Sequence, residues 1–69
     1  MPRIPALDGR KLMALLRRHG FVVVSQRGSH VKLRKAEVVL VVPVHGSRSL
    51  KRPTLLGILE DAGIDPNCI

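Results

Sequence analysis

The chain has 69 residues, enough for one small domain over residues 1–69, and its single phenylalanine predicts an aliphatic core without exposed aromatic platforms for base stacking. Lysine and arginine number 12 against 5 acidic residues, and the resulting net charge of +7 favours a polyanionic partner, above all nucleic acid. The lone cysteine, Cys68, excludes an internal disulfide and a zinc framework. No apolar run approaches the roughly 20 residues of a membrane span. We therefore expect a cytoplasmic protein without cofactor, metal or membrane partner.

The N-terminal part of the chain predicts a loose lead-in over residues 1–7, followed by a helix. Asp8 is a residue type that caps helices, because its side chain can accept from free backbone N–H groups. Three leucines have the i, i+3, i+4 spacing of one buried stripe: Leu12, Leu15 and Leu16. Gly20 suits the end of the helix, since glycine adopts the left-handed conformation of a C-terminal cap.

Three strands are predicted next, over Phe21–Arg27, His30–Lys35 and Val38–Val42. Gly28 and Ser29 supply the first tight turn. Ala36 and Glu37 supply the second. Pro43 ends the third strand, because proline has no N–H to donate to a ladder.

A second helix is predicted from about Pro53 to Ala62, followed by a tail over residues 65–69. The order α-β-β-β-α predicts an α+β fold of two layers, in which a three-stranded antiparallel sheet carries both helices on one face. The other face stays open. Because the third strand is apolar on both sides, valines should be exposed on this open face, which indicates a protein partner. The alternative is that the lead-in or the loop before the second helix covers these valines.

The tripeptide Gly28-Ser29-His30 carries the strongest functional signal in the sequence. Side chains alternate along a strand, so His30, Lys32 and Arg34 should share one outward face. A positioned imidazole can act as a general acid or base, and the two cations can hold phosphates. This face therefore predicts that the protein binds or cleaves RNA.

His45 is expected to lie near His30. With the second turn centred on Ala36 and Glu37, His30 pairs near Pro43, and His45 follows two residues later. Two neighbouring imidazoles could divide the base and acid roles in cleavage of RNA through its 2′-hydroxyl. A loop histidine that bonds its own backbone is the other interpretation, and the sequence leaves both open.

Four segments, taken together, resemble the HicA family of toxins. These are the run Leu12–Phe21, the Gly-Ser-His motif at 28–30, the strand exit Val42–His45, and the pattern of Leu50-Lys51, Thr54-Leu55, Ile58-Leu59 and Ala62–Ile64. The resemblance extends from about Asp8 to Ile64. The sequence departs from the family pattern at Arg52-Pro53 and in the short hairpin at Lys35–Glu37, both away from His30.

The resemblance implies a fold like that of double-stranded-RNA-binding domains, in agreement with the predicted element order. It further implies an endoribonuclease that cleaves messenger RNA and halts translation, with His30 as its catalytic histidine. A partner antitoxin of the HicB type is implied as well.

We therefore interpret the sequence as a metal-independent ribonuclease toxin, since its acidic residues are scattered and offer no metal ligand set. In this interpretation His30 is the acid/base residue, Gly28 lets the backbone approach the RNA, Ser29 bonds a phosphate, and charge comes from Arg27 as well as the two strand cations. A non-catalytic RNA-binding module of the same fold is the alternative, and a pure interaction protein is a third.

Overall fold

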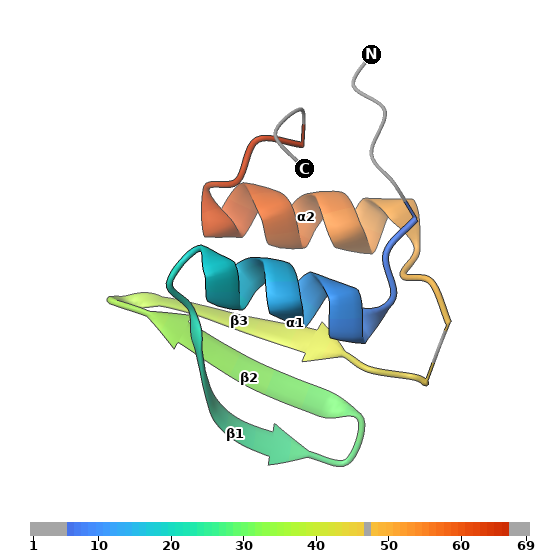
Figure 1. Cartoon of the computed structure of the whole chain (residues 1–69), viewed down its shortest axis with the longest axis horizontal. Coiled ribbons are helices and arrows are strands. Elements are labelled where there is room, and N and C mark those ends of the chain that lie inside the picture. The colour runs from blue at the N-terminus through green and yellow to red at the C-terminus, as the bar shows by residue number, and fades with distance from the viewer. Residues whose placement is uncertain (1–5, 47, 67–69) are drawn as a thin grey trace.

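The computed structural model describes residues 6–46 and 48–66; Cys68, most of the predicted lead-in and most of the tail lie outside them. The elements are α1 (Gly9–Arg18), β1 (Val22–Arg27), β2 (His30–Lys35), β3 (Val38–Pro43) and α2 (Arg52–Ala62). The three strands form one antiparallel sheet in the order β1-β2-β3, and both helices lie on the same face of it (Figure 1). The predicted two-layer α-β-β-β-α fold is confirmed.

Helix α1 has the predicted cap at each end. The Oδ1 atom of Asp8 accepts a hydrogen bond of 2.8 Å from the backbone N–H of Lys11, which satisfies one of the free donors of the first turn. At the other end Gly20 has a φ of +97°, and the backbone N–H of Phe21 donates to the carbonyl of Leu16. Phe21 was predicted to open the first strand, but it precedes β1 and is buried against the core.

Strand β2 lies between the other two strands, and its register fixes which residues share a face. His30 pairs with Pro43 of β3 and with Arg27 of β1. Val31 and Leu33 are buried under the helices, whereas His30, Lys32 and Arg34 are exposed, as the alternation predicted. The pairing of β1 slips at a bulge between Val23 and Ser25, and every residue of β1 is exposed.

Helix α2 closes the core from the same side of the sheet. Pro53 lies in its first turn, and Gly63 adopts the left-handed conformation at its end, with a φ of +72°. The core consists of buried aliphatic side chains and one aromatic ring: Leu12, Leu16, Phe21, Val31, Leu33, Leu40, Val42, Leu55, Ile58, Leu59 and Ile64. Within the described segments, neither α1, with 10 residues, nor α2, with 11, is long and apolar enough to cross a membrane.

The first residue of α1 rests directly on the end of β3. A Cβ atom built on Gly9 would lie 2.5 Å from the carbonyl oxygen of Pro43 and 2.9 Å from the Cα atom of Val44. Only a residue without a side chain fits this approach. Because Pro43 is the ladder partner of His30, Gly9 sets the distance between α1 and the end of the sheet that carries the histidine.

Candidate functional site

Two histidines lie together at one end of the sheet, as the sequence predicted. His30 opens β2, and His45 follows the exit of β3; their ring centroids are 6.5 Å apart, with the ring planes at 84°. The backbone N–H of Val44 donates to the carbonyl of Ser29 over 2.6 Å and so ties the β3 exit to the hairpin beside His30. Two backbone segments that are remote in sequence therefore hold the imidazole pair. Both histidine side chains are exposed.

The hairpin before His30 offers an open backbone. Gly28 has a φ of +56°, a conformation that glycine adopts at low cost, and a Cβ atom built there would meet no atom of the described residues within 4 Å. The Gln26 side chain supports the turn, because its Nε2 donates to the carbonyl of Gly28 over 3.2 Å. The backbone at Gly28 is therefore uncovered on the side where a side chain would lie, and its contact with RNA stays a prediction.

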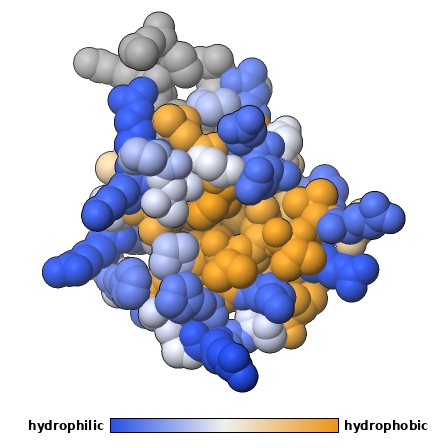
Figure 2. All heavy atoms as spheres, turned by 180° about the vertical axis from the view of Figure 1, so that it is seen from behind, coloured by the Kyte–Doolittle hydropathy of each residue, from blue (hydrophilic) through white to orange (hydrophobic). Residues whose placement is uncertain are grey.

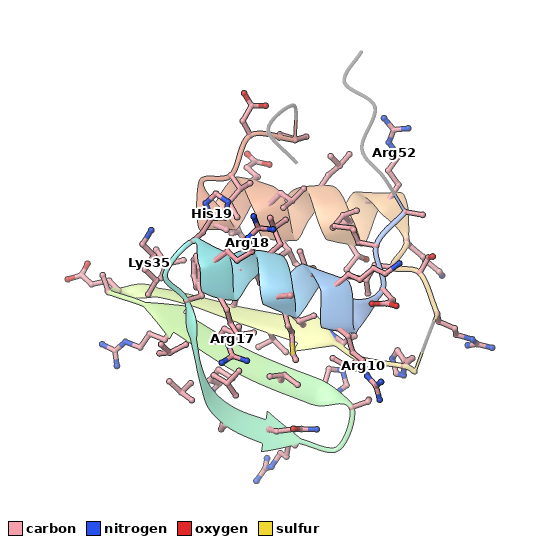
Figure 3. The ribbon with its side chains drawn as sticks, viewed as in Figure 1. Arg10, Arg17, Arg18, His19, Lys35 and Arg52 are labelled. Atoms are coloured by element: carbon pink, nitrogen blue, oxygen red, sulfur yellow. The ribbon has the colours of Figure 1, made fainter. Side chains whose placement is uncertain are left out.

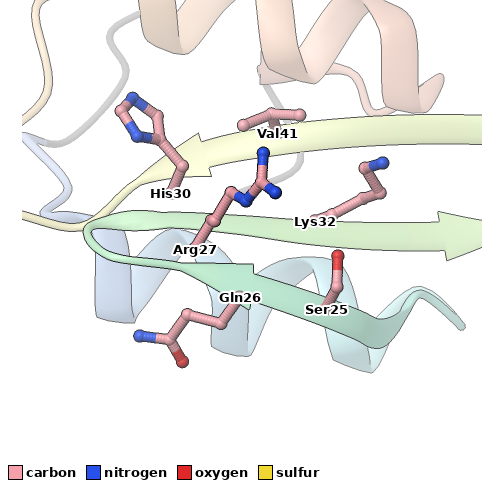
Figure 4. Close-up of a pocket in the computed structure, with 6 residues that line it drawn as sticks. All are labelled: Ser25, Gln26, Arg27, His30, Lys32 and Val41. Carbon is pink, nitrogen blue, oxygen red and sulfur yellow. The ribbon is translucent and has the colours of Figure 1, made fainter.

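A depression of about 450 Å³ lies beside His30 on the sheet. It is lined by Ser25, Gln26, Arg27, His30, Lys32 and Val41. In Figure 4 Arg27, His30 and Lys32 project to the same side of the sheet, whereas Gln26 points away from them. None of the described residues that line it is acidic, so the depression presents an imidazole and two cations, a combination that suits a phosphate group.

A second, smaller depression of about 240 Å³ lies beside His45. It is lined by Pro43, His45, Arg48, Ser49, Leu50, Lys51 and Thr54. The two histidines therefore lie between two depressions, each of which contains two cations. Neither Arg48 nor Lys51 was predicted from the sequence as a site residue.

Arg34 shares the face of His30 but not its surroundings. Arg34 lies four residues after His30 along β2, and its Nε atom donates over 2.7 Å to the carbonyl of Ala36 in the turn at the far end of the strand. Along a strand, four residues span roughly 13 Å. The structure thus brings Arg27 and Lys32 together with His30, and it leaves Arg34 at the opposite end of the sheet.

The open face of the sheet also carries the predicted exposed valines. In the ladder, Val41 lies beside Lys32 and Val39 beside Arg34; the two valine side chains are 47% and 50% exposed. Val22, on the other side of Arg34, is 59% exposed. Figure 2 shows apolar side chains gathered on this side of the molecule with hydrophilic ones around them. An apolar strip thus runs beside the cations, a combination typical of interaction surfaces.

Gly9 was not identified from the sequence, although it positions the site. Glycine is a poor helix former, and its occurrence at the start of α1 was the available signal for a close approach. In the part of the chain that the structure describes, no three histidine, cysteine, aspartate or glutamate side chains gather as metal ligands would.

Comparison with known proteins agrees with this arrangement. The sequence matches a family model described as "HicA toxin of bacterial toxin-antitoxin" over residues 9–64, from the first residue of α1 to the core residue that follows α2. No curated protein matches the chain. The matched region includes all five elements, the Gly-Ser-His hairpin and both histidines. The chain therefore belongs to the HicA family, the toxins of bacterial toxin–antitoxin systems.

Proposed function

We propose that this HicA-family toxin is an endoribonuclease that cleaves messenger RNA and uses His30 as a general acid/base. One observation carries the proposal: His30 and His45 lie 6.5 Å apart, between two depressions lined by cations. A surface that only binds RNA needs the cations but gains nothing from a pair of imidazoles. The pair therefore favours cleavage over binding alone.

The two imidazoles supply the proton transfers that cleavage through the 2′-hydroxyl requires. One imidazole removes the proton of the 2′-hydroxyl, whose oxygen attacks the adjacent phosphorus. The new bond from the 2′-oxygen to phosphorus forms as the bond from phosphorus to the 5′-oxygen breaks. The other imidazole, protonated, gives its proton to the departing 5′-oxygen. The products are a 2′,3′-cyclic phosphate and a free 5′-hydroxyl. General acid–base groups of this kind contribute about 10²–10⁴ in rate each.

The cations on both sides of the histidine pair support the reaction in two ways. Arg27 and Lys32 on the sheet, with Arg48 and Lys51 on the loop, can hold phosphates on either side of the bond that is cut. They also face the place where negative charge grows on the phosphorus oxygens, and charge placed in advance stabilises that transition state. The exposed turn residue Gly28 lets the RNA backbone come close to His30, and the half-buried Ser29 lies between the two.

The direct test compares His30→Ala with His19→Ala on an RNA of defined sequence. His19 is the matched control, because it is exposed at the end of α1 and takes no part in either depression (Figure 3). We expect His30→Ala to lower the cleavage rate by about 10²–10⁴ while His19→Ala leaves it unchanged. Cleavage should persist in excess chelator, and a 2′-deoxyribose at the cut site should block it.

Each other outcome has a clear meaning. Unchanged cleavage by His30→Ala would show that His30 is not the acid/base residue. Loss of cleavage in chelator, restored by magnesium, would refute the metal-independent mechanism. RNA binding without any cleavage by the unaltered protein would identify a non-catalytic RNA-binding module.

The partner antitoxin, which we propose to be of the HicB type, is expected to cover the open sheet face. Val39 and Val41 supply the apolar area that a protein interface buries, and Lys32 beside them favours an acidic partner. A partner on this face would also cover His30. Inhibition would then follow from the exclusion of RNA.

A further inference from the structure

Helix α1 carries an unusual concentration of positive charge on its solvent side. Four of its 10 residues are cations, and it contains no acidic residue. The single exposed alanine between them, Ala14, has all four cations as its i−4, i−3, i+3 and i+4 neighbours, the positions that surround a residue on a helix surface. We call this surface the Ala14 patch; it consists of Ala14, Arg10, Lys11, Arg17 and Arg18.

The geometry of the helix places this charge in two rows, one on either side of Ala14. Arg10 and Arg17 are seven residues apart, as are Lys11 and Arg18, so each pair spans two turns, or roughly 10 Å. Figure 3 shows Arg10 and Arg17 projecting from the same side of α1, with Arg18 on the adjoining side. The small side chain of Ala14 leaves the centre of the patch low, so that an anion can lie between the four cations.

The Ala14 patch begins beside the histidine end of the sheet but does not lie on the open face. Gly9, the residue before Arg10, rests against Pro43, which pairs with His30. Leu12 and Leu16 fix α1 to the other face of the sheet through the core. A strand that leaves the His30 depression around this end can therefore continue along α1, and a partner on the open face leaves the patch accessible.

The chemistry of the patch favours the phosphates of a nucleic acid over a protein. Protein interfaces bury apolar anchors at their centre. The large apolar side chains that are exposed on the described residues all belong to the strands, and none lies in the patch. Contacts between cations and phosphates need no such anchor, and they carry no sequence information.

We propose that the Ala14 patch is a second RNA-binding surface, which holds the phosphates of the substrate strand beyond the cleavage site. This inference rests on the proposed ribonuclease function. It predicts that long RNA binds better than short RNA, because only a long strand reaches both surfaces. An RNA of about twenty nucleotides spans roughly 68 Å when stacked, twice the 34 Å longest dimension of the protein.

A single substitution tests the patch by placing a negative charge at its centre. Ala14→Glu places a carboxylate among all four cations, where it competes with phosphate, and Ala14→Gln is the neutral control of nearly equal size. Both side chains are good helix formers at an exposed position, so both variants should fold. In a His30→Ala background, where RNA stays intact, Ala14→Glu should weaken binding of the long RNA about tenfold relative to Ala14→Gln and flatten its log–log salt dependence by about one unit or more.

Turnover by protein with an intact His30 gives a second readout. Ala14→Glu should raise KM for the long RNA about as much as it weakens binding, with kcat unchanged and with KM for a trinucleotide unchanged. A double variant, Arg17→Gln with Arg18→Gln, removes charge instead of adding it and should act in the same direction.

The outcomes separate this inference from the proposed function. Equal affinity and equal salt dependence of the Ala14→Glu and Ala14→Gln proteins would overturn the second surface, whether or not His30 cleaves RNA. Weaker antitoxin binding with unchanged RNA binding would instead make the patch a protein interface. Cleavage that does not need His30 would overturn the proposed mechanism, while the binding comparison would still report on the patch.

Discussion

Replacing Gly9 with alanine should damage both the stability of the protein and its site, although alanine is normally the better helix residue. The added methyl group would lie 2.5 Å from the carbonyl oxygen of Pro43 and 2.9 Å from the Cα atom of Val44. These are backbone atoms, so no side chain can rotate away to relieve the contact. Helix α1 must instead move away from the end of β3, and His30 pairs with the displaced residue.

The size of the effect follows from two opposed terms. Overpacking of this kind destabilises a protein by about 1–3 kcal/mol. The higher helix propensity of alanine offsets this loss by at most about 1 kcal/mol, the value for a helix interior. We expect a net loss of about 1–2 kcal/mol in the free energy of unfolding, which lowers Tm by roughly 5–15 °C for a domain of this size. Thermal unfolding followed by circular dichroism measures it. The rate of RNA cleavage at a temperature where the variant is folded should fall by about tenfold or more, because the reacting groups are misplaced.

Gly57 provides the matched control, since it lies within α2 and a Cβ atom built there would meet nothing within 4 Å in the segments 6–46 and 48–66. Gly57→Ala should therefore stabilise the protein by about 0.5–1 kcal/mol. If Gly9→Ala is as stable as the unaltered protein, or gains as much stability as Gly57→Ala, the close approach of α1 to β3 does not constrain the fold as we argue.

Three further predictions concern the site. Changing Arg27 and Lys32 to glutamine should flatten the salt dependence of RNA binding by about one to two log units per log unit of salt. Arg34→Gln should change the salt dependence less, because the Arg34 side chain bonds a turn far from His30. Equal effects would contradict this ranking. His45→Ala should lower the cleavage rate by about 10² or more with little change in RNA affinity, and an unchanged rate would make it a structural loop residue. Amide exchange should slow in β2 and β3 when the antitoxin binds; protection confined to the helices would show that inhibition does not cover the active face.

The fold was predictable because its signals are local. Period-two alternation in β2 placed Val31 and Leu33 inside, and the leucine spacing of α1 placed Leu12 and Leu16 inside. Glycine marked the end of each helix, because both ends need a left-handed residue. The proximity of His30 and His45 also followed from local rules, since the centre of a two-residue turn fixes the register of a hairpin.

The remaining features depend on contacts that no local pattern encodes. The approach of Gly9 to Pro43 joins residues far apart in the sequence. Arg34 shares the strand periodicity of Lys32, but its guanidinium group bonds a turn carbonyl, a choice of side-chain conformation that periodicity cannot predict. The cations beside His45 lie on a loop, and the position of a loop follows from the elements that it joins rather than from its own composition.

The exposed edge of strand β1 implies that the positive charge of this chain also opposes aggregation. Its consecutive valines Val22, Val23 and Val24 are 59%, 45% and 49% exposed, and within the described part of the chain no strand lies beyond it in the sheet. An edge strand of this composition is a template for aggregation, which the bulge in β1 only partly counteracts. With a net charge of +7, copies of the free toxin repel one another. This repulsion weakens as salt shortens the Debye length to about 8 Å at physiological ionic strength. Free toxin should therefore lose solubility as ionic strength rises, and the charge that attracts RNA also keeps the unpartnered toxin dispersed.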